Sequence, residues 1–130
     1  MRKNSLLLHI LLIGTFLIST AYFPLNAQKL DETAKLLPSD GSAEDFFGNA
    51  VATDGEIAVI GAWFDDNLKG SAYVFRKEGD NWSEEEKLTA SDGSSYDFFG
   101  HSIAIHGDDV IIGATGTGNK GAAYIFHYNG

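Results

Sequence analysis

The sequence predicts an all-β protein built from two repeated, four-stranded antiparallel units. The first observation is a repeat, because "KLLPSDGSAEDFFG" (35–48) recurs as "KLTASDGSSYDFFG" (87–100), with ten of the fourteen positions identical. The second is a series of short apolar and β-branched runs separated by turn signals such as "TDG" and "KEGDN". The third is that no stretch after residue 27 carries the 3.6-residue pattern of an amphipathic helix.

The repeat extends well beyond this segment. The two copies are shifted by 52 residues, and a period near 50 indicates repeated supersecondary units. The other matching pairs are 30–36 with 82–88, 48–62 with 100–114, and 70–75 with 121–126, the last after a loop that is one residue shorter.

The first unit is predicted to hold four strands in order. Residues 49–53 alternate small and branched side chains, and residues 57–62 form a nearly continuous apolar run that fits a strand buried on both faces. Residues 71–76 are aromatic and β-branched. Residues 82–89 are the most polar, so we expect an outer edge strand whose charges block pairing with other chains.

The outer strand has a counterpart before the first unit. Trp82 and Leu88 recur as Leu30 and Leu36, and their even spacing predicts that both members of a pair lie in the core on one strand face. Residues 30–36 are therefore predicted to form an outer strand, which brings the total to eight strands.

Four short antiparallel strands in each repeat fit the blades of a β-propeller. Propellers close with about four to eight blades, so two blades leave apolar faces such as 57–60 and 110–112 without a neighbour. Three arrangements would cover them. The strand at 30–36 pairs with residues 122–126 of the same chain, the chain is a piece of a longer propeller, or it is a protomer that completes a ring with copies of itself.

The tetrapeptide "DFFG" occurs in both units, between an outer strand and the next inner strand. It is predicted to be the joint between blades. The aromatic pairs are expected to fill the gap between adjacent sheets, the aspartates to cap the turn, and the glycines to let the chain bend. The residues of the two joints are Asp45, Phe46, Phe47, Gly48, Asp97, Phe98, Phe99 and Gly100.

The first 27 residues have the pattern of a secretory signal peptide. Arg2 and Lys3 form a basic start, residues 6–23 are mostly apolar, Pro24 breaks the run, and Ala27 supplies a small residue for cleavage. The alternative is an uncleaved membrane anchor, since such a run nearly spans a bilayer. We expect a signal peptide over 1–27, two repeats over 28–130, and a secreted or cell-surface location.

The composition narrows the range of partners. The net charge is −9 and there is no cysteine. The acidity argues against nucleic acid, which requires a basic face, and disfavours an anionic membrane surface. An exported chain without disulfides depends on packing or bound ions for its stability.

The spacing of "FG" and "GA" in both units resembles the FG-GAP repeat. The pairs are Phe47-Gly48 with Gly61-Ala62, and Phe99-Gly100 with Gly113-Ala114. FG-GAP repeats build the β-propellers of integrin α chains and of many secreted bacterial proteins, and this chain is most similar to the bacterial type. The third letter of "GAP" differs, being Trp63 in one unit and Thr115 in the other. The resemblance implies a non-catalytic binding or adhesion module whose partner is a protein or glycan outside the cell.

Calcium is the cofactor that the resemblance raises, because some integrin FG-GAP repeats bind it in a D-x-D-x-D-G loop. The matching loop at 63–70 offers Asp65, Asp66 and Asn67 as candidate ligands, but these are adjacent and lack the alternating spacing. The second unit's loop at 115–121 has no acid. A solvated acidic turn is the alternative, and we expect calcium to matter little and no other cofactor to be required.

No catalytic constellation is evident in the sequence. The "GTGNKG" motif at 116–121 resembles a dinucleotide fingerprint, but a strand follows it where a helix is required. Ser102 in "GHSIA" resembles a nucleophile elbow, but its surroundings continue as a strand and its repeat partner is Ala50. Binding is the leading function, and the alternative is an accessory propeller part of a secreted enzyme that acts on glycans or lipids.

Overall fold

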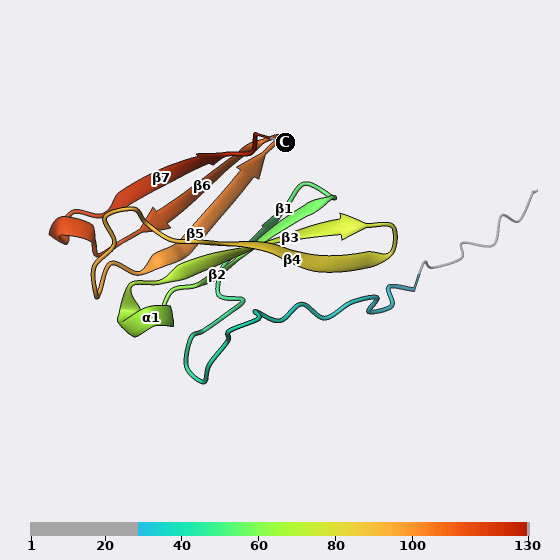
Figure 1. Ribbon diagram of the computed structural model, residues 1–130, viewed down its shortest axis with the longest axis horizontal. Helices are drawn as coiled ribbons and strands as arrows, with labels where there is room; N and C mark the ends of the chain where they lie inside the picture. The colour runs from blue at the N-terminus through green and yellow to red at the C-terminus, as the bar shows by residue number, and fades with distance from the viewer. Residues whose placement is uncertain (1–28, 130) are drawn as a thin grey trace, which may run out of the picture. The chain divides into compact units, whose positions relative to one another are not determined.

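The computed structural model describes residues 29–129, so the predicted signal peptide over 1–27 lies outside the described residues. The chain divides into two units, Met1–Asp31 and Glu32–Gly130, and the second holds every element named here. No helix among residues 29–129 is long and apolar enough to span a membrane. The elements in Figure 1 are β1 (Val51–Thr53), β2 (Ile57–Ala62), α1 (Asp65–Leu68), β3 (Ser71–Glu78), β4 (Asn81–Leu88), β5 (Phe99–His106), β6 (Asp109–Ala114), η1 (Thr117–Asn119) and β7 (Ala122–His127).

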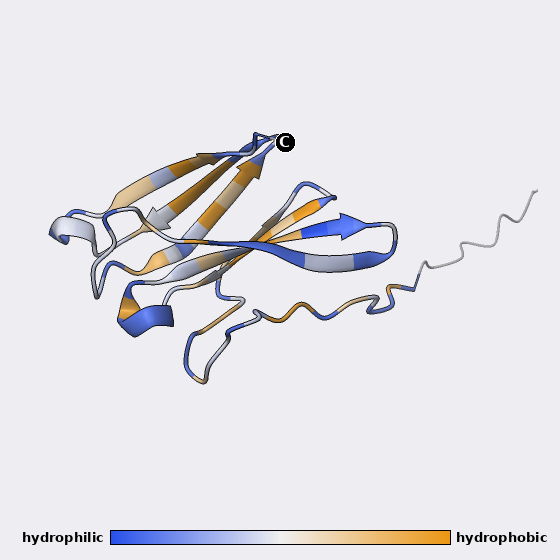
Figure 2. Cartoon of the chain, viewed as in Figure 1, coloured by the Kyte–Doolittle hydropathy of each residue, from blue (hydrophilic) through white to orange (hydrophobic). Residues whose placement is uncertain are grey.

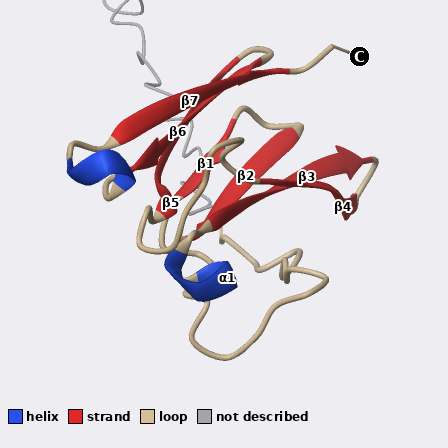
Figure 3. Ribbon diagram, turned by 60° about the vertical axis from the view of Figure 1, so that its left-hand side comes forward, coloured by secondary structure: helices blue, strands red, loops and turns tan. Residues whose placement is uncertain are grey.

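The strands form two antiparallel sheets, which confirms the all-β fold class. Sheet A has the order β1-β2-β3-β4, and sheet B has the order β5-β6-β7. Each sheet is a meander in which consecutive strands pair as neighbours, as expected of propeller blades. The helical turns α1 and η1 are short and lie in the connections between strands (Figure 3).

The second blade has one strand fewer than the four expected. Sheet B has three strands, and the residues 30–36 form no strand, so the described residues hold seven strands rather than eight. The expected pairing of 30–36 with β7 does not occur in this chain. Leu36 packs against the face of sheet A that points away from sheet B.

The main core lies between the two sheets. Sheet A contributes alternate residues of β2 and β3, and sheet B contributes alternate residues of β6, so a period of two places these side chains on the facing surfaces. Figure 2 shows the hydrophobic residues concentrated on the inner strands, whereas β4 and the end of β3 are hydrophilic. The buried members are Ile57, Val59, Ala72, Leu88, Phe99, Val110, Ile112 and Ala114.

A β-bulge in β4 changes the face on which its side chains lie. Val74 pairs with Glu86 and Phe75 pairs with Glu84, so Glu85 is an extra residue in the strand. One extra residue moves the following side chains to the other face of a sheet. Leu88 therefore lies in the core between the sheets, whereas Trp82 packs on the opposite face of sheet A. The prediction that these two side chains share a face is wrong.

A second, smaller core covers the outer face of sheet A. Its buried members are Ile60, Ala62, Tyr73 and Phe75. Leu36 and Phe47, which precede β1, pack against this cluster. The segment before the first strand therefore covers the outer face of sheet A, as sheet B covers its inner face.

Candidate functional site

The second phenylalanine of each "DFFG" packs against its own sheet in the same way. The ring of Phe47 lies with its centroid 5.6 Å from that of Tyr73, and 6.1 Å from that of Phe75. The ring of Phe99 lies 5.5 Å from Tyr124 and 6.0 Å from Phe126. All four pairs are edge-to-face, a favourable arrangement for aromatic rings. The sequence repeat is thus also a repeat of side-chain geometry.

The aspartates of the two joints hold the turns that precede the strands. The Asp97 carboxylate accepts a hydrogen bond from the Ser94 amide at 2.7 Å, and the Asp45 carboxylate accepts the matching bond from Ser42. The Asp97 carbonyl also accepts a hydrogen bond from the Gly116 amide at 3.0 Å, and the Asp45 carbonyl accepts the matching bond from the Phe64 amide at 3.3 Å. These bonds connect each joint to the loop after the second strand of its own sheet.

The backbone of the second joint passes directly against the backbone at the end of sheet A. The Phe98 amide donates to the Leu68 carbonyl at 3.0 Å, and the Phe99 amide donates to the Lys69 carbonyl at 2.8 Å. A side chain at Gly61 would meet the Gly100 carbonyl oxygen at 2.0 Å, and one at Gly70 would meet the Phe99 carbonyl oxygen at 2.0 Å. Glycine is required because two backbones pass each other with no room for a Cβ atom.

The first phenylalanines of the two joints belong to a group of exposed and half-buried aromatic rings, which we call the aromatic cluster. Phe64 lies 4.9 Å from Phe46 and 4.3 Å from Trp63, measured between ring centroids. Trp63 lies 5.3 Å from Phe98 and so bridges the two joints. The side chain of Phe46 is 53% exposed and that of Tyr96 is 62% exposed. The members of the aromatic cluster are Phe46, Trp63, Phe64, Tyr96 and Phe98.

The backbone under the aromatic cluster is strained at matching positions of both repeats. Phe46 and Phe98 have φ values of 54° and 58°, in the left-handed region. Glu44 and Tyr96, two residues earlier, have values of 74° and 71°. Bulky residues rarely adopt this conformation, and such strain is concentrated at functional sites. The two loops therefore present their aromatic rings at a cost in stability.

Lys87 on β4 is the centre of a charged network on the outer face of sheet A. Its Nζ lies 2.7 Å from the Asp40 carboxylate, 2.7 Å from the Asp65 carboxylate and 3.7 Å from the Asp66 carboxylate. The Tyr73 hydroxyl donates a hydrogen bond to Asp40 at 2.8 Å. The same bond recurs in sheet B, where the Tyr124 hydroxyl donates to Asp92 at 2.7 Å.

This network shifts the pKa values of its members. Hydrogen bonds from Lys87 and then from Tyr73 lower the pKa of Asp40 below its usual value. Burial opposes the charge of Lys87, but hydrogen bonds to Asp40 and Asp65 outweigh it and raise the pKa of the ammonium. Burial, followed by the hydrogen bond to Asp40, raises the pKa of Tyr73. All three groups therefore keep their charge states near neutral pH.

The three candidate calcium ligands do not converge on one point. Asp65 is buried and faces Lys87, the Asp66 side chain is 61% exposed, and Asn67 donates from Nδ2 to Ser95 Oγ at 2.9 Å. Within residues 29–129, no group of three or more histidine, cysteine, aspartate or glutamate side chains is placed to hold a metal ion. The ammonium of Lys87 lies beside Asp65, in the position that a cation would occupy.

Sequence reasoning missed the role of Lys87, although the repeat contained a signal for it. Lys87 recurs as Lys35, and its partner Asp40 recurs as Asp92. The recurrence of both residue types at matching positions is a sequence signal for this contact, although Lys35 and Asp92 form no ion pair with each other within residues 29–129. The pairing lies between segments 47 residues apart in the chain, so local pattern alone does not reveal it.

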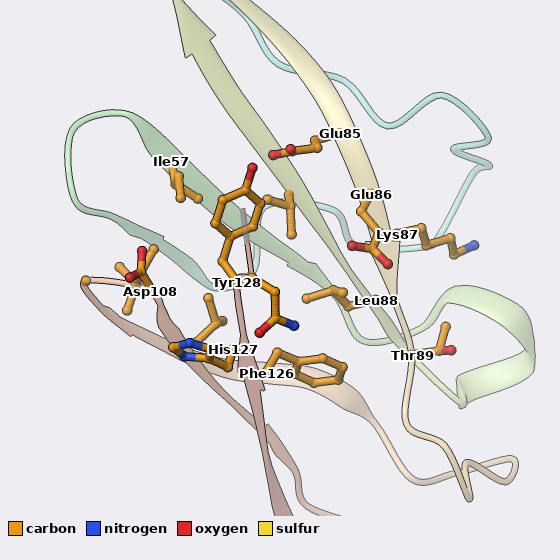
Figure 4. Close-up of a pocket in the computed structure, with 15 residues that line it drawn as sticks. Ile57, Glu85, Glu86, Lys87, Leu88, Thr89, Asp108, Phe126, His127 and Tyr128 are labelled. Carbon is orange, nitrogen blue, oxygen red and sulfur yellow. The ribbon is translucent and has the colours of Figure 1, made fainter.

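A cavity of about 550 Å³ lies between the two sheets, lined by residues of β4 and β7 and by the turn between β5 and β6 (Figure 4). Its lining includes apolar side chains of both sheets, among them Leu88, Val110 and Phe126, together with Glu86 and Tyr128. The cavity adjoins the edge at which sheet A has a fourth strand and sheet B has none. No feature of the sequence predicted a cavity at this place.

The fold and the joints define a repeat protein of stacked antiparallel blades. The sequence pattern of the FG-GAP repeat matches residues 30–75 and 82–126, so the chain belongs to the FG-GAP repeat family. Each match begins with the segment before the joint, and the chain is therefore a β-propeller-type module of two repeats. No curated protein matches the sequence.

Proposed function

We propose that the protein is an exported, non-catalytic binding module, and that the aromatic cluster contacts a protein or glycan ligand outside the cell. The observation that carries this proposal is the exposure of the aromatic rings of Phe46 and Tyr96 on strained loops. Aromatic rings with one face open to solvent are enriched at binding surfaces, where they supply contact area at low entropic cost.

The electrostatics of the cluster favour a neutral or basic ligand. Glu44 and Asp66 lie on the same loops and are exposed, and the whole chain has a net charge of −9. Like charges would repel an acidic partner. The flat faces of sugar rings and the side chains of neutral or basic peptides both stack well on aromatic rings.

Membership of the FG-GAP family supports a binding role, since such repeats are generally non-catalytic. The signal pattern over 1–27 supports export. N-terminal sequencing of the protein collected outside expressing cells tests this step. We expect the mature chain to begin at Gln28, and retention of Met1 on a membrane-bound product would contradict it.

The binding role is tested by a glycan array and a pull-down from the extracellular fraction, followed by titration of each ligand found. Tyr96→Ala and Phe46→Ala remove exposed rings, and we expect each to weaken binding by about tenfold, as for an interface anchor. Tyr128→Ala is the matched control, because Tyr128 is 42% exposed and lies outside the aromatic cluster. Equal losses in all three variants, or no ligand in either screen, would contradict the proposal.

A further inference from the structure

Sheet A is completed by a segment that belongs to the second repeat. Residues 82–88 pair with β3 as its fourth strand, and the chain then continues into the joint at 97–100. There the Phe98 and Phe99 amides donate to the carbonyls of Leu68 and Lys69. One continuous segment, 82–100, thus supplies both the outer strand and the joint that close the end of sheet A.

The matching segment 30–48 has the same sequence features but makes none of these contacts. Residues 30–36 pair with no strand among the described residues, and the Phe46 and Phe47 amides meet no acceptor there. Leu36 nevertheless packs on the outer core of sheet A, as Leu88 packs on sheet B. Leu36 therefore packs on the repeat that follows it, as Leu88 does, but the described residues 29–129 hold no sheet before this segment for it to complete.

Sheet B lacks the two features that the segment 82–100 supplies to sheet A, a fourth strand and a joint. Its edge strand β7 has no fourth strand beside it, and the carbonyls of Asn119 and Lys120, which match Leu68 and Lys69, accept no hydrogen bond in residues 29–129. Ile111 is 44% exposed, whereas its repeat partner Val59 is fully buried. Ile125, at 70% exposed, occupies the place of the half-buried Val74. Large apolar side chains exposed together on one face indicate a contact surface.

The residues that make two polar contacts in the completed sheet A recur in the sequence, but the recurring residues do not contact each other in this chain. Glu84 accepts hydrogen bonds from the Ser39 amide at 2.7 Å and from the Ser39 hydroxyl at 2.8 Å. The repeat places Glu32 and Ser91 in the same roles. Likewise, the pair formed by Lys87 and Asp40 is repeated by residues that lie apart in this chain and are exposed, namely Lys35 and Asp92.

We propose that residues 30–48 of one copy complete sheet B of a second copy, as its fourth strand and its joint. The donated strand would pair with β7 and cover the cavity beside it, a case of strand addition to an open edge. Lys35 of one copy would pair with Asp92 of the other, and Glu32 would accept hydrogen bonds from Ser91. The occupant is a second copy because this chain carries both halves of the contact, matched residue by residue to the joint that it already forms.

The proposed contact joins different surfaces of the two copies, so it is a head-to-tail contact that forms either a ring or a filament. Rings of about four to eight blades are the sizes that propellers adopt, which corresponds to about two to four copies. The proposed self-assembly requires no external ligand, and Tyr96 lies outside the donated segment, whereas Phe46 belongs both to the aromatic cluster and to the segment 30–48.

The first test is the mass of the protein purified from cells that express the full chain, measured by light scattering after size exclusion. We expect a mass of two to four protomers, with Lys35→Asp and Asp92→Lys each reducing it toward one protomer. Combining the two substitutions in one chain should restore assembly, because the charges are exchanged rather than removed. Lys77→Asp is the control, since Lys77 is an exposed lysine on β3 outside this contact.

The second test uses the absence of cysteine from the chain. Chains with Glu32→Cys are mixed with chains with Ser91→Cys and oxidised, and we expect a disulfide-linked dimer that requires both variants. A mixture of Lys77→Cys and Ser91→Cys chains is the control and should give no such band.

Three outcomes would overturn the proposal: a monomer at all concentrations, an oligomer that neither charge reversal affects, or sheet B occupied by a different FG-GAP protein. A monomer that still binds a ligand through the aromatic cluster would leave the proposed function intact. An assembled oligomer without any ligand would leave the self-assembly intact and contradict the proposed function.

Discussion

Lys87 Nζ lies 2.7 Å from the Asp65 carboxylate, so an ion pair ties the outer strand of sheet A to the turn that follows β2. The Asp65 side chain is only 8% exposed and that of Lys87 is 24% exposed. Removing one member of such a pair leaves the other partly buried and without its partner. The pair also links the two repeats, because β4 precedes the second joint in the chain whereas Asp65 belongs to the first repeat.

Calcium is expected to leave the stability of the protein unchanged. The ammonium of Lys87 already neutralises Asp65, and Asn67 points to Ser95 instead of toward the carboxylates. Thermal melts in millimolar calcium and in chelator should give the same melting temperature. A higher melting temperature in calcium that disappears in Asp65→Ala would contradict this, since a ligand that binds the native state raises its stability.

Phe99→Ala is expected to lower the free energy of unfolding by about 3–5 kcal/mol, the cost of truncating a fully buried aromatic ring. Phe99 is 0% exposed and lies between the sheets, in contact with Tyr124 and Phe126. Phe46→Ala is the matched control at an exposed position and should cost less than about 1 kcal/mol. Denaturant titrations measure both, and equal costs would show that the second joint is not part of the core.

Gly61→Ala is expected to destabilise the protein by about 3 kcal/mol, because the added methyl group forces two backbones apart. Its Cβ would lie 2.0 Å from the Gly100 carbonyl oxygen, which belongs to the other sheet. Gly93→Ala is the control, since the nearest neighbour of its added Cβ would be the Ala90 carbonyl oxygen at 3.1 Å. If the two substitutions have the same effect in urea melts, the close approach of the two sheets at Gly61 is wrong.

Acid is expected to remove the contribution of Asp40 to stability. Hydrogen bonds from Lys87 and Tyr73 lower its pKa below the ordinary value of 3.8, so the unfolded chain binds a proton more readily than the folded one. The contribution is therefore complete above the unfolded pKa and is lost as the pH falls through the lower folded pKa.

The comparison of Asp40→Asn with wild type between pH 7 and pH 2 tests this prediction. The difference in unfolding free energy between the two proteins should be largest at neutral pH and should shrink below pH 4. Asp80→Asn removes the same charge from an exposed turn and serves as the control. A difference that stays constant over the whole range would show that the Asp40 carboxylate is not stabilised by its partners.

Much of the fold could be predicted from the sequence because the repeat and the strand patterns are local. Residues 57–62 form β2 with the predicted bounds, and 71–76 lie within β3. The predicted strand at 82–89 is β4 at Asn81–Leu88. Alternation and turn residues act over a few positions, so they carry this information without any knowledge of the neighbouring sheet.

Features that depend on contacts between residues distant in the sequence were decided only by the tertiary structure. Residues 30–36 carry the pattern of an outer strand but form none, because a strand requires an edge to pair with and this chain places none beside them. The bulge at Glu85 separates Trp82 from Leu88, and the pairing of Lys87 with Asp40 and Asp65 assembles the charged network. The sequence alone determined the strands within each unit and the joints, because these follow from local residue patterns. The stacking of the two sheets decided that both faces of sheet A are covered, whereas the face of sheet B that carries Ile111 and Ile125 stays exposed.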